Sequence, residues 1–311
     1  MKIGIAKENI PGETRVALLP QEVGEIIRAG HPVFVEKDAG IGIFISNEEY
    51  EKIGAQIIED PVEIYNKDIV VKLKAPRPEE FQMLKIKNNI VLSMFHHQQQ
   101  PWNIDLLKAA NSVVVALEML ENEAGERLVN CNRMNGQQGM LMAFHYALKV
   151  PEECGILMLG YGEVASGALA AAFSLGAYVK ILRRGEFPQI EYFLKDKDMV
   201  VNALKWPREK RDKKEYLITR PMLKLLNRGA IIMDLAVDYP GPIETTRPTT
   251  LGDPFYLEEE IKHFSIYGYP ALSPISSSRR YSKQIVGIVL EIAKKGLKNA
   301  PEYIQKAVIK A

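Results

Sequence analysis

Residues 157–184 constrain the fold of this chain more than any other segment. They read LMLGYGEVASGALAAAFSLGAYVKILRR: an apolar run, a glycine-rich turn, a stretch of small residues and a second apolar run. This order predicts a strand, a tight turn, a helix and a parallel strand, the unit from which parallel sheets are built. Short β-like runs alternate with helical segments through most of the chain, so we expect an α/β architecture throughout.

Two series of such units are predicted. The first contains KIGIAKE, PVFVEK, DIVVKLK, NIVLSMF and SVVVALEML, and the second contains the glycine stretch, DMVVNAL, GAIIMDLAV and FSIYGYP. A helix near 133–150 connects the two series, and a helix over 276–295 with an apolar stripe closes the chain. The apolar face predicted for the connecting helix consists of Met140, Leu141, Phe144 and Leu148.

The order of these segments predicts a chain that leaves one domain, builds a second and returns. We expect two Rossmann-like α/β domains with mostly parallel sheets, helices on both faces and a cleft between them. Residues 1–130 and 276–311 would form a discontinuous substrate and catalytic domain. Residues 131–275 would form the dinucleotide-binding domain.

Composition excludes several classes of function. The 311 residues carry 40 Lys+Arg and 39 Asp+Glu, which leaves no broad basic field for a nucleic acid or a membrane surface. The first residues lack the apolar stretch of a signal peptide, and no run approaches the roughly 18 apolar residues of a membrane span. Cys131 and Cys154 lack the spacing of metal ligands. We expect a cytoplasmic homo-oligomer without metal, nucleic-acid or membrane partners.

Gly160, Gly162 and Ala165 match the pattern G-x-G-x-x-[G/A]. The first glycine permits the tight turn, the second lets phosphates approach the backbone, and the small third residue lets helix and strand pack closely. The amide dipoles of the following helix would point at a pyrophosphate. A lone match also occurs in turns that bind nothing, but the strand, helix and second strand around this one favour a dinucleotide site.

The end of the second strand predicts which dinucleotide is bound. Sites of this kind usually place a carboxylate about 20 residues after the first glycine, where it accepts hydrogen bonds from the ribose hydroxyls. Arg183 stands there, Arg184 follows, and no acid occurs between Tyr178 and Arg184. Guanidinium groups suit phosphate oxygens, which predicts NADP(H) rather than NAD(H). The alternative is a solvated basic pair, with Glu186 making the ribose contact and NAD(H) as the cofactor.

Six ordered blocks resemble the alanine dehydrogenase and pyridine nucleotide transhydrogenase family over nearly the whole chain. They are KIGIAKENIPGETRVALLP, VVKLKAP, LSMFHH, the glycine turn, DLAVDYPGPIETTRPTT and the closing helix. The short chain, the paired arginines, FHHQQQPW and YPALSPISSSRRYSK are more similar to one branch, which makes secondary amines. That branch contains N5-(carboxyethyl)ornithine synthase and the lysine-forming saccharopine dehydrogenase.

The resemblance implies roles for four residues. Arg15 and Lys74 would hold the carboxylate of a 2-oxo acid, His96 would be the general acid and base, and Asp238 would lie near the nicotinamide; Lys74 and Asp238 count with His96 as catalytic groups. The chemistry agrees, because a carboxylate needs cations and an imidazole titrates near neutrality. Each residue also has an ordinary alternative: surface ion pairs for the two cations, a structural role for His96 or its neighbour His97, and a turn for Asp238.

Two departures from alanine dehydrogenase bear on the substrate. Ala75 replaces an acid that is usual in that enzyme, and Gly268 replaces an asparagine, which would leave room for a larger amine. We therefore predict NADPH-dependent condensation of a pyruvate-like 2-oxo acid with the amino group of an ornithine-like or lysine-like amino acid, giving an N-(carboxyalkyl) amino acid. The alternatives are reductive amination of pyruvate with ammonia, and a non-catalytic transhydrogenase-like nucleotide-binding subunit. Candidates for binding the amine are Gln98, Gln99, Arg279 and Arg280.

Overall fold

The computed structural model describes residues 1–84, 89–96 and 102–310. The chain divides into two compact units. Unit 1 comprises Met1–Asn130 and Ser273–Ala311, and unit 2 comprises Cys131–Leu272. The chain re-enters unit 1 at the start of the long helix α10 (Pro274–Lys295).

Unit 1 contains a seven-stranded sheet in the order β13-β6-β5-β4-β1-β2-β3. Its strands are β1 (Ile3–Ile5), β2 (Val33–Glu36), β3 (Gln56–Ile58), β4 (Ile69–Lys74), β5 (Ile90–Met94), β6 (Val113–Ala116) and β13 (Val308–Lys310). Neighbours run parallel, except that β13 is antiparallel to β6. The chain runs from β1 to β2 and β3 and then resumes at β4 on the other side of β1. The switch point of the sheet therefore lies between β1 and β4.

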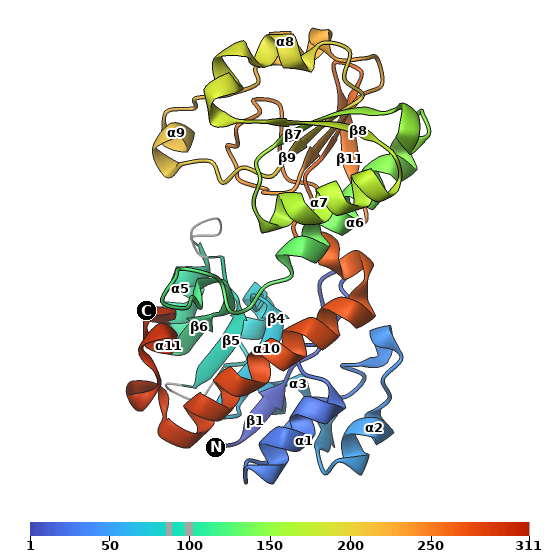
Figure 1. The fold of residues 1–311 in the computed structure, drawn as a ribbon. Helices are drawn as coiled ribbons and strands as arrows, with labels where there is room; N and C mark the ends of the chain where they lie inside the picture. The colour runs from blue at the N-terminus through green and yellow to red at the C-terminus, as the bar shows by residue number, and fades with distance from the viewer. Residues whose placement is uncertain (85–88, 97–101, 311) are drawn as a thin grey trace. The chain divides into compact units, whose positions relative to one another are not determined.

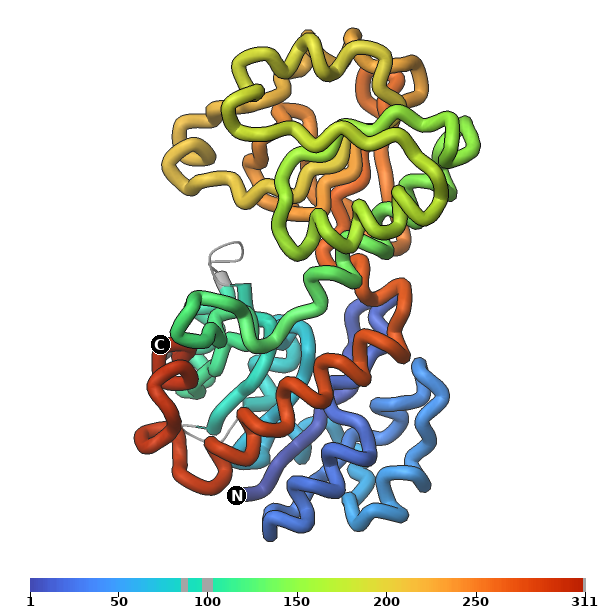
Figure 2. The backbone as a smooth tube through the Cα atoms, in the orientation of Figure 1, coloured from blue at the N-terminus to red at the C-terminus, as the bar shows by residue number. Residues whose placement is uncertain are grey.

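Helices cover the sheet of unit 1. They are α1 (Pro20–Arg28), α2 (Asn47–Lys52), α3 (Pro61–Tyr65), α4 (Pro78–Phe81), α5 (Trp102–Ala110), α10 and α11 (Glu302–Lys306), with short 3-10 turns η1 (Ile41–Ile43), η2 (Leu117–Met119) and η7 (Leu297–Asn299). Val70, Val91 and Val114 pack with side chains of α3, α4 and α5 on one face. The helices α1 and α10 lie side by side (Figure 1, Figure 2). The predicted apolar stripe of α10 is confirmed, since Tyr281, Ile285, Ile288, Val289 and Ile292 are buried.

Unit 2 contains a six-stranded sheet in the order β11-β12-β10-β9-β7-β8. Its strands are β7 (Gly155–Leu159), β8 (Tyr178–Leu182), β9 (Met199–Asn202), β10 (Ile231–Asp234), β11 (Phe255–Glu258) and β12 (Ile261–Phe264). The pairs are parallel, apart from the antiparallel hairpin of β11 and β12. The chain passes from β7 to β8 and returns to β9 on the other side of β7, so the switch point lies between β7 and β9.

Two layers of helices enclose this second sheet. They are α6 (Asn132–Tyr146), α7 (Glu163–Ser174), α8 (Ile190–Leu194) and α9 (Arg208–Asp212), with 3-10 turns η3 (Pro151–Glu153), η4 (Arg184–Gln189), η5 (Arg220–Leu225) and η6 (Tyr269–Leu272). Side chains of α6 and α7 pack with Met158 and Val201 on one face, and those of α8 and η5 pack with Leu157 and Val200 on the other. The predicted fold class, two Rossmann-like α/β domains with mostly parallel sheets, is confirmed. Among the described residues, no helix has the length and apolar character needed to cross a membrane.

The prediction for the face of α6 is partly wrong. This helix ends at Tyr146, so Leu148 lies beyond it, and both Leu141 and Leu148 are exposed. The buried face instead contains Gly136, where an added Cβ would stand 1.8 Å from the carbonyl oxygen of Val164 on α7. The two helices approach each other closely because this face has glycine, so hydrophobicity alone did not identify it.

Candidate functional site

The predicted substrate-binding residues of unit 1 follow the carboxyl ends of neighbouring parallel strands. Arg15 lies in the loop after β1, Lys74 is the last residue of β4, and His96 comes two residues after β5. These strands are adjacent in the order β5-β4-β1. Ligands of open α/β sheets bind at this edge beside the switch point. The structure therefore brings the three residues to the edge where a ligand is expected.

Arg15 forms a buried ion pair with its near neighbour Glu13. Arg15 Nε lies 2.6 Å from Glu13 Oε1, and Nη2 lies 2.5 Å from Oε2. The guanidinium also lies 5.7 Å from the ring centroid of Tyr281 on α10. With 3% of Arg15 exposed, the alternative of a surface ion pair does not apply. The forked pair fixes the plane of the guanidinium, which is the arrangement needed to present its remaining donors in one direction.

Serine hydroxyls of α10 hold the loop that carries Arg15. The backbone N–H of Val16 donates to Ser278 Oγ at 3.2 Å, and that of Leu19 donates to Ser282 Oγ at 2.8 Å. Ser282 in turn donates to Glu22 Oε2 at 2.7 Å. Sequence reasoning missed these serines. The sequence feature that could have identified them is that Ser278 and Ser282 interrupt the apolar stripe of α10, where both are buried.

Lys74 is half-buried in a strongly charged environment. Glu8 Oε1 accepts the N–H of Leu73 at 2.5 Å, and Glu8 Oε2 lies 4.0 Å from Lys72 Nζ. Burial raises the pKa of Glu8 above its ordinary value. Burial, followed by repulsion from Arg15, lowers the pKa of Lys74. Because two cations repel each other in a poorly solvated place, an anionic ligand between them would be stabilised.

His96 has a strained backbone that a carboxylate supports. Its φ is 46°, in the left-handed region that few residues other than glycine adopt. Glu118, just after β6, accepts the N–H of Phe95 at 2.9 Å and that of His96 at 2.5 Å. The imidazole Nδ1 of His96 lies 3.9 Å from Glu118 Oε1. Sequence reasoning missed Glu118, although a carboxylate at the end of the neighbouring strand was a usable signal. His97, Gln98 and Gln99 lie outside the described residues.

The glycine turn of unit 2 fits a phosphate-bearing ligand. Gly160 follows β7 with φ of 103°, and an added Cβ would stand 2.9 Å from the carbonyl oxygen of Ala203. Gly162 caps α7, and a Cβ added there would meet no atom within 4 Å. Ala165 is fully buried on the face of α7 that packs on the sheet. The turn therefore leaves open space in front of the N-terminus of α7, where a pyrophosphate is stabilised.

A pocket of about 1050 Å³ adjoins this turn. Arg183 and Arg184 line it, both are exposed, and neither forms a salt bridge with another described residue. Lys180 of β8 also lines the pocket, together with Glu186, whose Oε1 lies 2.5 Å from Lys180 Nζ. Sequence reasoning missed Lys180, which lies on β8, three residues before Arg183. The remaining lining residues are Gly160, Tyr161, Ile181, Leu182, Gly185, Phe187 and Leu204.

Asp238 joins two loops at the carboxyl edge of the sheet in unit 2. Its Oδ2 accepts the N–H of Trp206 at 2.9 Å, and its Oδ1 lies 3.3 Å from Arg211 Nη1. Both partners follow β9, whereas Asp238 follows β10. Its contacts therefore go beyond the local turn that was the ordinary alternative.

Asp234, at the end of β10, organises the loop that leads to Asp238. Its Oδ1 accepts hydrogen bonds from Asn202 Nδ2 at 2.9 Å, Ala236 N–H at 3.0 Å and Val237 N–H at 3.1 Å. Its Oδ2 is buried and has no hydrogen-bond partner among the residues that the structure describes. Burial raises the pKa of Asp234 to about 6. Sequence reasoning missed this aspartate, although it stands at a strand end.

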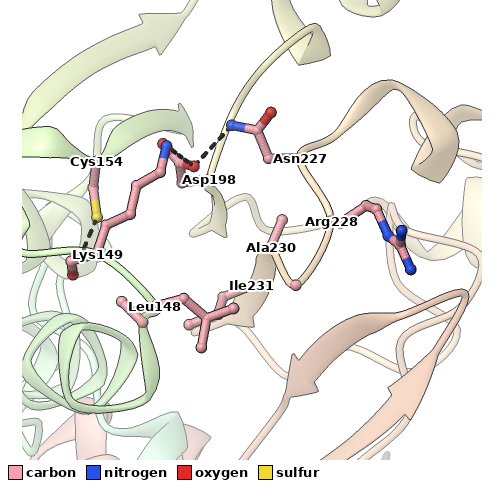
Figure 3. Close-up of a pocket in the computed structure, with 10 residues that line it drawn as sticks. Leu148, Lys149, Cys154, Asp198, Asn227, Arg228, Ala230 and Ile231 are labelled. Atoms are coloured by element: carbon pink, nitrogen blue, oxygen red, sulfur yellow. Dashed lines mark hydrogen bonds and ion pairs between the residues drawn. The ribbon is translucent and has the colours of Figure 1, made fainter.

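Figure 3 shows a second, smaller cavity, of about 70 Å³, at the opposite edge of the sheet in unit 2. Lys149 Nζ lies 2.8 Å from Asp198, which also accepts hydrogen bonds from Gly155 N–H and Asn227 Nδ2. The thiol of Cys154 lies 3.9 Å from the carbonyl oxygen of Lys149, and burial raises its pKa. These groups satisfy one another at the amino ends of the strands, which indicates a structural role.

Two family models match most of the chain. Residues 4–136 match the alanine dehydrogenase/PNT N-terminal domain, and residues 183–310 match the alanine dehydrogenase/PNT C-terminal domain. Alanine dehydrogenase 1 of Staphylococcus aureus (strain bovine RF122 / ET3-1) is 30% identical over 339 residues, covering 96% of this chain and 90% of that protein. The same protein in strain Mu50 / ATCC 700699 matches with the same identity and coverage.

Solved structures share the fold. An L-alanine dehydrogenase superposes with a TM-score of 0.85 at 22% identity, covering 100% of this chain and 96% of that one. A transhydrogenase from Sinorhizobium meliloti superposes with a TM-score of 0.80 at 21% identity, covering 94% and 95%. The predicted family is confirmed, whereas the narrower branch that makes secondary amines stays a prediction. This chain therefore belongs to the alanine dehydrogenase/PNT family.

Proposed function

We propose that this chain is an NAD(P)-dependent amino-acid dehydrogenase that reductively aminates a 2-oxo acid, with pyruvate and ammonia as its substrates. The observation that carries the proposal is the pair of cations, Arg15 and Lys74, at the switch point of unit 1, with His96 just after the next strand, β5. The relatives named alanine dehydrogenase support ammonia as the amine. The sequence alone favoured an amino acid as the amine substrate, with ammonia as the alternative, and the relatives reverse that preference.

The residues of unit 1 would bind the substrate and move a proton. Arg15, fixed by Glu13, and Lys74 would hold the carboxylate of the oxo acid, and Lys74 would also polarise the carbonyl oxygen. His96 would donate a proton to that oxygen as the amine adds and water leaves. The lowered pKa of Lys74 supports an anionic ligand, because a carboxylate would offset the repulsion between the two cations.

The residues of unit 2 would bind the cofactor, which supplies the hydride. Gly160, Gly162 and Ala165 would shape the site for its pyrophosphate at the N-terminus of α7. Arg183 and Arg184 would hold a 2′-phosphate, which makes NADP(H) the preferred cofactor and NAD(H) the alternative. Asp238 would stand beside the nicotinamide, with its carboxylate oriented by its ion pair with Arg211.

A second candidate function is condensation of the oxo acid with the amino group of an amino acid. Ala75, next to Lys74, supports it, because a methyl group occupies less volume than the acid that is usual in alanine dehydrogenase. Gly268 no longer supports it. Its φ of 102° is a conformation that glycine adopts freely, so the backbone alone accounts for glycine at this position. Arg279 and Arg280 are exposed on α10, and Arg280 Nε donates to the carbonyl oxygen of Asn130 at 3.0 Å.

The deciding experiment supplies the purified full chain with pyruvate, NADPH or NADH, and either ammonia or a single amino acid such as ornithine or lysine. Oxidation of the cofactor with ammonia supports the first proposal, and oxidation only with an amino acid supports the second. Cofactor binding without turnover under any condition would favour a transhydrogenase-like binding subunit. The same preparation tests the predicted homo-oligomer by sedimentation, and the cytoplasmic location stays a prediction.

A further inference from the structure

The cofactor pocket of unit 2 contains an acid whose two oxygens are both engaged. Among the described residues that line the pocket, Glu186 is the one carboxylate. Its Oε2 accepts the N–H of Arg183 at 2.8 Å, and its Oε1 lies 2.5 Å from Lys180 Nζ. The ion pair with Lys180, then the hydrogen bond from Arg183, lowers the pKa of Glu186, so this acid is anionic at neutral pH.

A second contact holds Lys180 in this position. Its ammonium lies 4.8 Å from the ring centroid of Phe193 on α8, within the range of a cation–π interaction. Lys180 therefore lies between an aromatic ring and a carboxylate. Because the charges of Lys180 and Glu186 offset each other, Arg183 and Arg184 provide the net positive charge of the pocket.

Recognition of an unphosphorylated ribose requires a carboxylate with oxygens that accept hydrogen bonds from its hydroxyls. Glu186 has that chemistry and lies three residues beyond the position where such a carboxylate is expected. We propose that Lys180 determines cofactor preference: by pairing with Glu186 it withholds the one acid of the pocket from the ribose and leaves the pocket cationic for a 2′-phosphate. The inference rests on the proposed binding of a dinucleotide by unit 2, and it adds a specificity residue to that site.

The test is Lys180→Met, which keeps an unbranched apolar side chain beside Phe193 and removes the charge. Oε1 of Glu186 then loses its partner while Oε2 keeps the N–H of Arg183, so NADPH should bind roughly tenfold more weakly and NADH several-fold more tightly, as expected for one charge-assisted contact. Both dissociation constants are measured on the full chain by fluorescence titration at one fixed salt concentration, since ions screen exposed charges.

Two matched variants isolate the effect of the acid. In Lys180→Met/Glu186→Gln, the pocket has the same net charge as in the original chain, so NADPH affinity should return to within about twofold. Lys195→Met removes one exposed lysine of the same unit that does not line the pocket, and it should leave both affinities unchanged.

The outcomes separate this inference from the proposed function. Equal weakening of both cofactors by Lys180→Met, or failure of Glu186→Gln to reverse its effect, overturns the role of Lys180. If the original chain binds both cofactors and Lys180→Met does not alter their ratio, this inference alone fails. If the original chain binds neither cofactor, the proposed dinucleotide site itself is wrong.

Discussion

Asp234 gives unit 2 a dependence of stability on pH that can be worked out from its surroundings. The side chain is fully buried, and burial raises its pKa from 3.8 to about 6. One oxygen accepts three hydrogen bonds, and the other has no partner among the described residues. The substitution Asp234→Asn keeps an oxygen acceptor of the same size and removes the titration.

The sign follows from the two pKa values. Because the folded pKa is the higher one, the folded chain binds the proton more tightly than the unfolded chain. The resulting stabilisation is complete below the unfolded value of 3.8 and is lost as the pH rises through about 6. A shift of about two pKa units is worth about 3 kcal/mol over the whole range. Between about pH 8 and about pH 5, linkage gives a gain of about 1.4 kcal/mol.

The assay is urea unfolding at several pH values from about 5 to about 8. In a Trp102→Phe background, the buried Trp206 is the one tryptophan and reports on unit 2. From about pH 8 to about pH 5, the original chain should gain about 1.4 kcal/mol of unfolding free energy relative to Asp234→Asn. Asp253→Asn, at an exposed aspartate of the same unit, is the matched control. A difference that stays constant with pH, or that grows toward alkaline pH, would refute the argument from burial.

Three further predictions concern cofactor choice, proton transfer and helix packing. Arg183→Asp should weaken NADPH binding more than about tenfold and spare NADH binding, because it removes a charge-assisted phosphate contact; equal losses in titrations of both cofactors would contradict it. His96→Ala should lower kcat roughly 100-fold with cofactor affinity intact, because proton transfer is lost; an unchanged steady-state rate would remove His96 from catalysis. Gly136→Ala should cost about 3 kcal/mol in urea unfolding, because its Cβ would stand 1.8 Å from a backbone oxygen. Gly287→Ala, which faces open space in α10, should instead stabilise by about 0.5–1 kcal/mol, and a similar effect at both glycines would argue against close packing of α6 and α7.

The fold was predictable where burial follows a simple period. Continuous apolar runs marked the parallel strands, and the stripe ending at Ile292 marked α10. The prediction for the face of α6 was partly wrong, because Gly136 packs against the carbonyl of Val164 on α7 and a glycine has no hydrophobic signal of its own. The hairpin of β11 and β12 was also missed. The sequence predicts a strand over FSIYGYP, whereas β12 ends at the first residue of that segment, Phe264.

The candidate site was predictable to the extent that strand ends converge. The resemblance to the family implied roles for Arg15, Lys74 and His96, and the structure adds that all three stand at the carboxyl ends of neighbouring strands. The side chains that contact the candidate residues could not be predicted from the sequence. Glu118 supports His96 only because β6 lies next to β5, and Lys180 meets Glu186 only because the turn after β8 folds back on the strand. Such pairings depend on distances that an unaligned sequence does not contain.

The serines that hold the Arg15 loop determine when this loop can complete its folding during synthesis of the chain. Val16 and Leu19 are bonded to hydroxyls that follow them by 262 and 263 positions. At a ribosomal elongation rate of about 5–20 residues per second, roughly 13–50 s separate the synthesis of the two partners. All of unit 2 is made in that interval. The loop is thus among the first parts of the polypeptide to be translated and among the last to form its native hydrogen bonds. In a nascent chain that stalls before α10, the loop that carries Arg15 would lack its hydrogen bonds to Ser278 and Ser282.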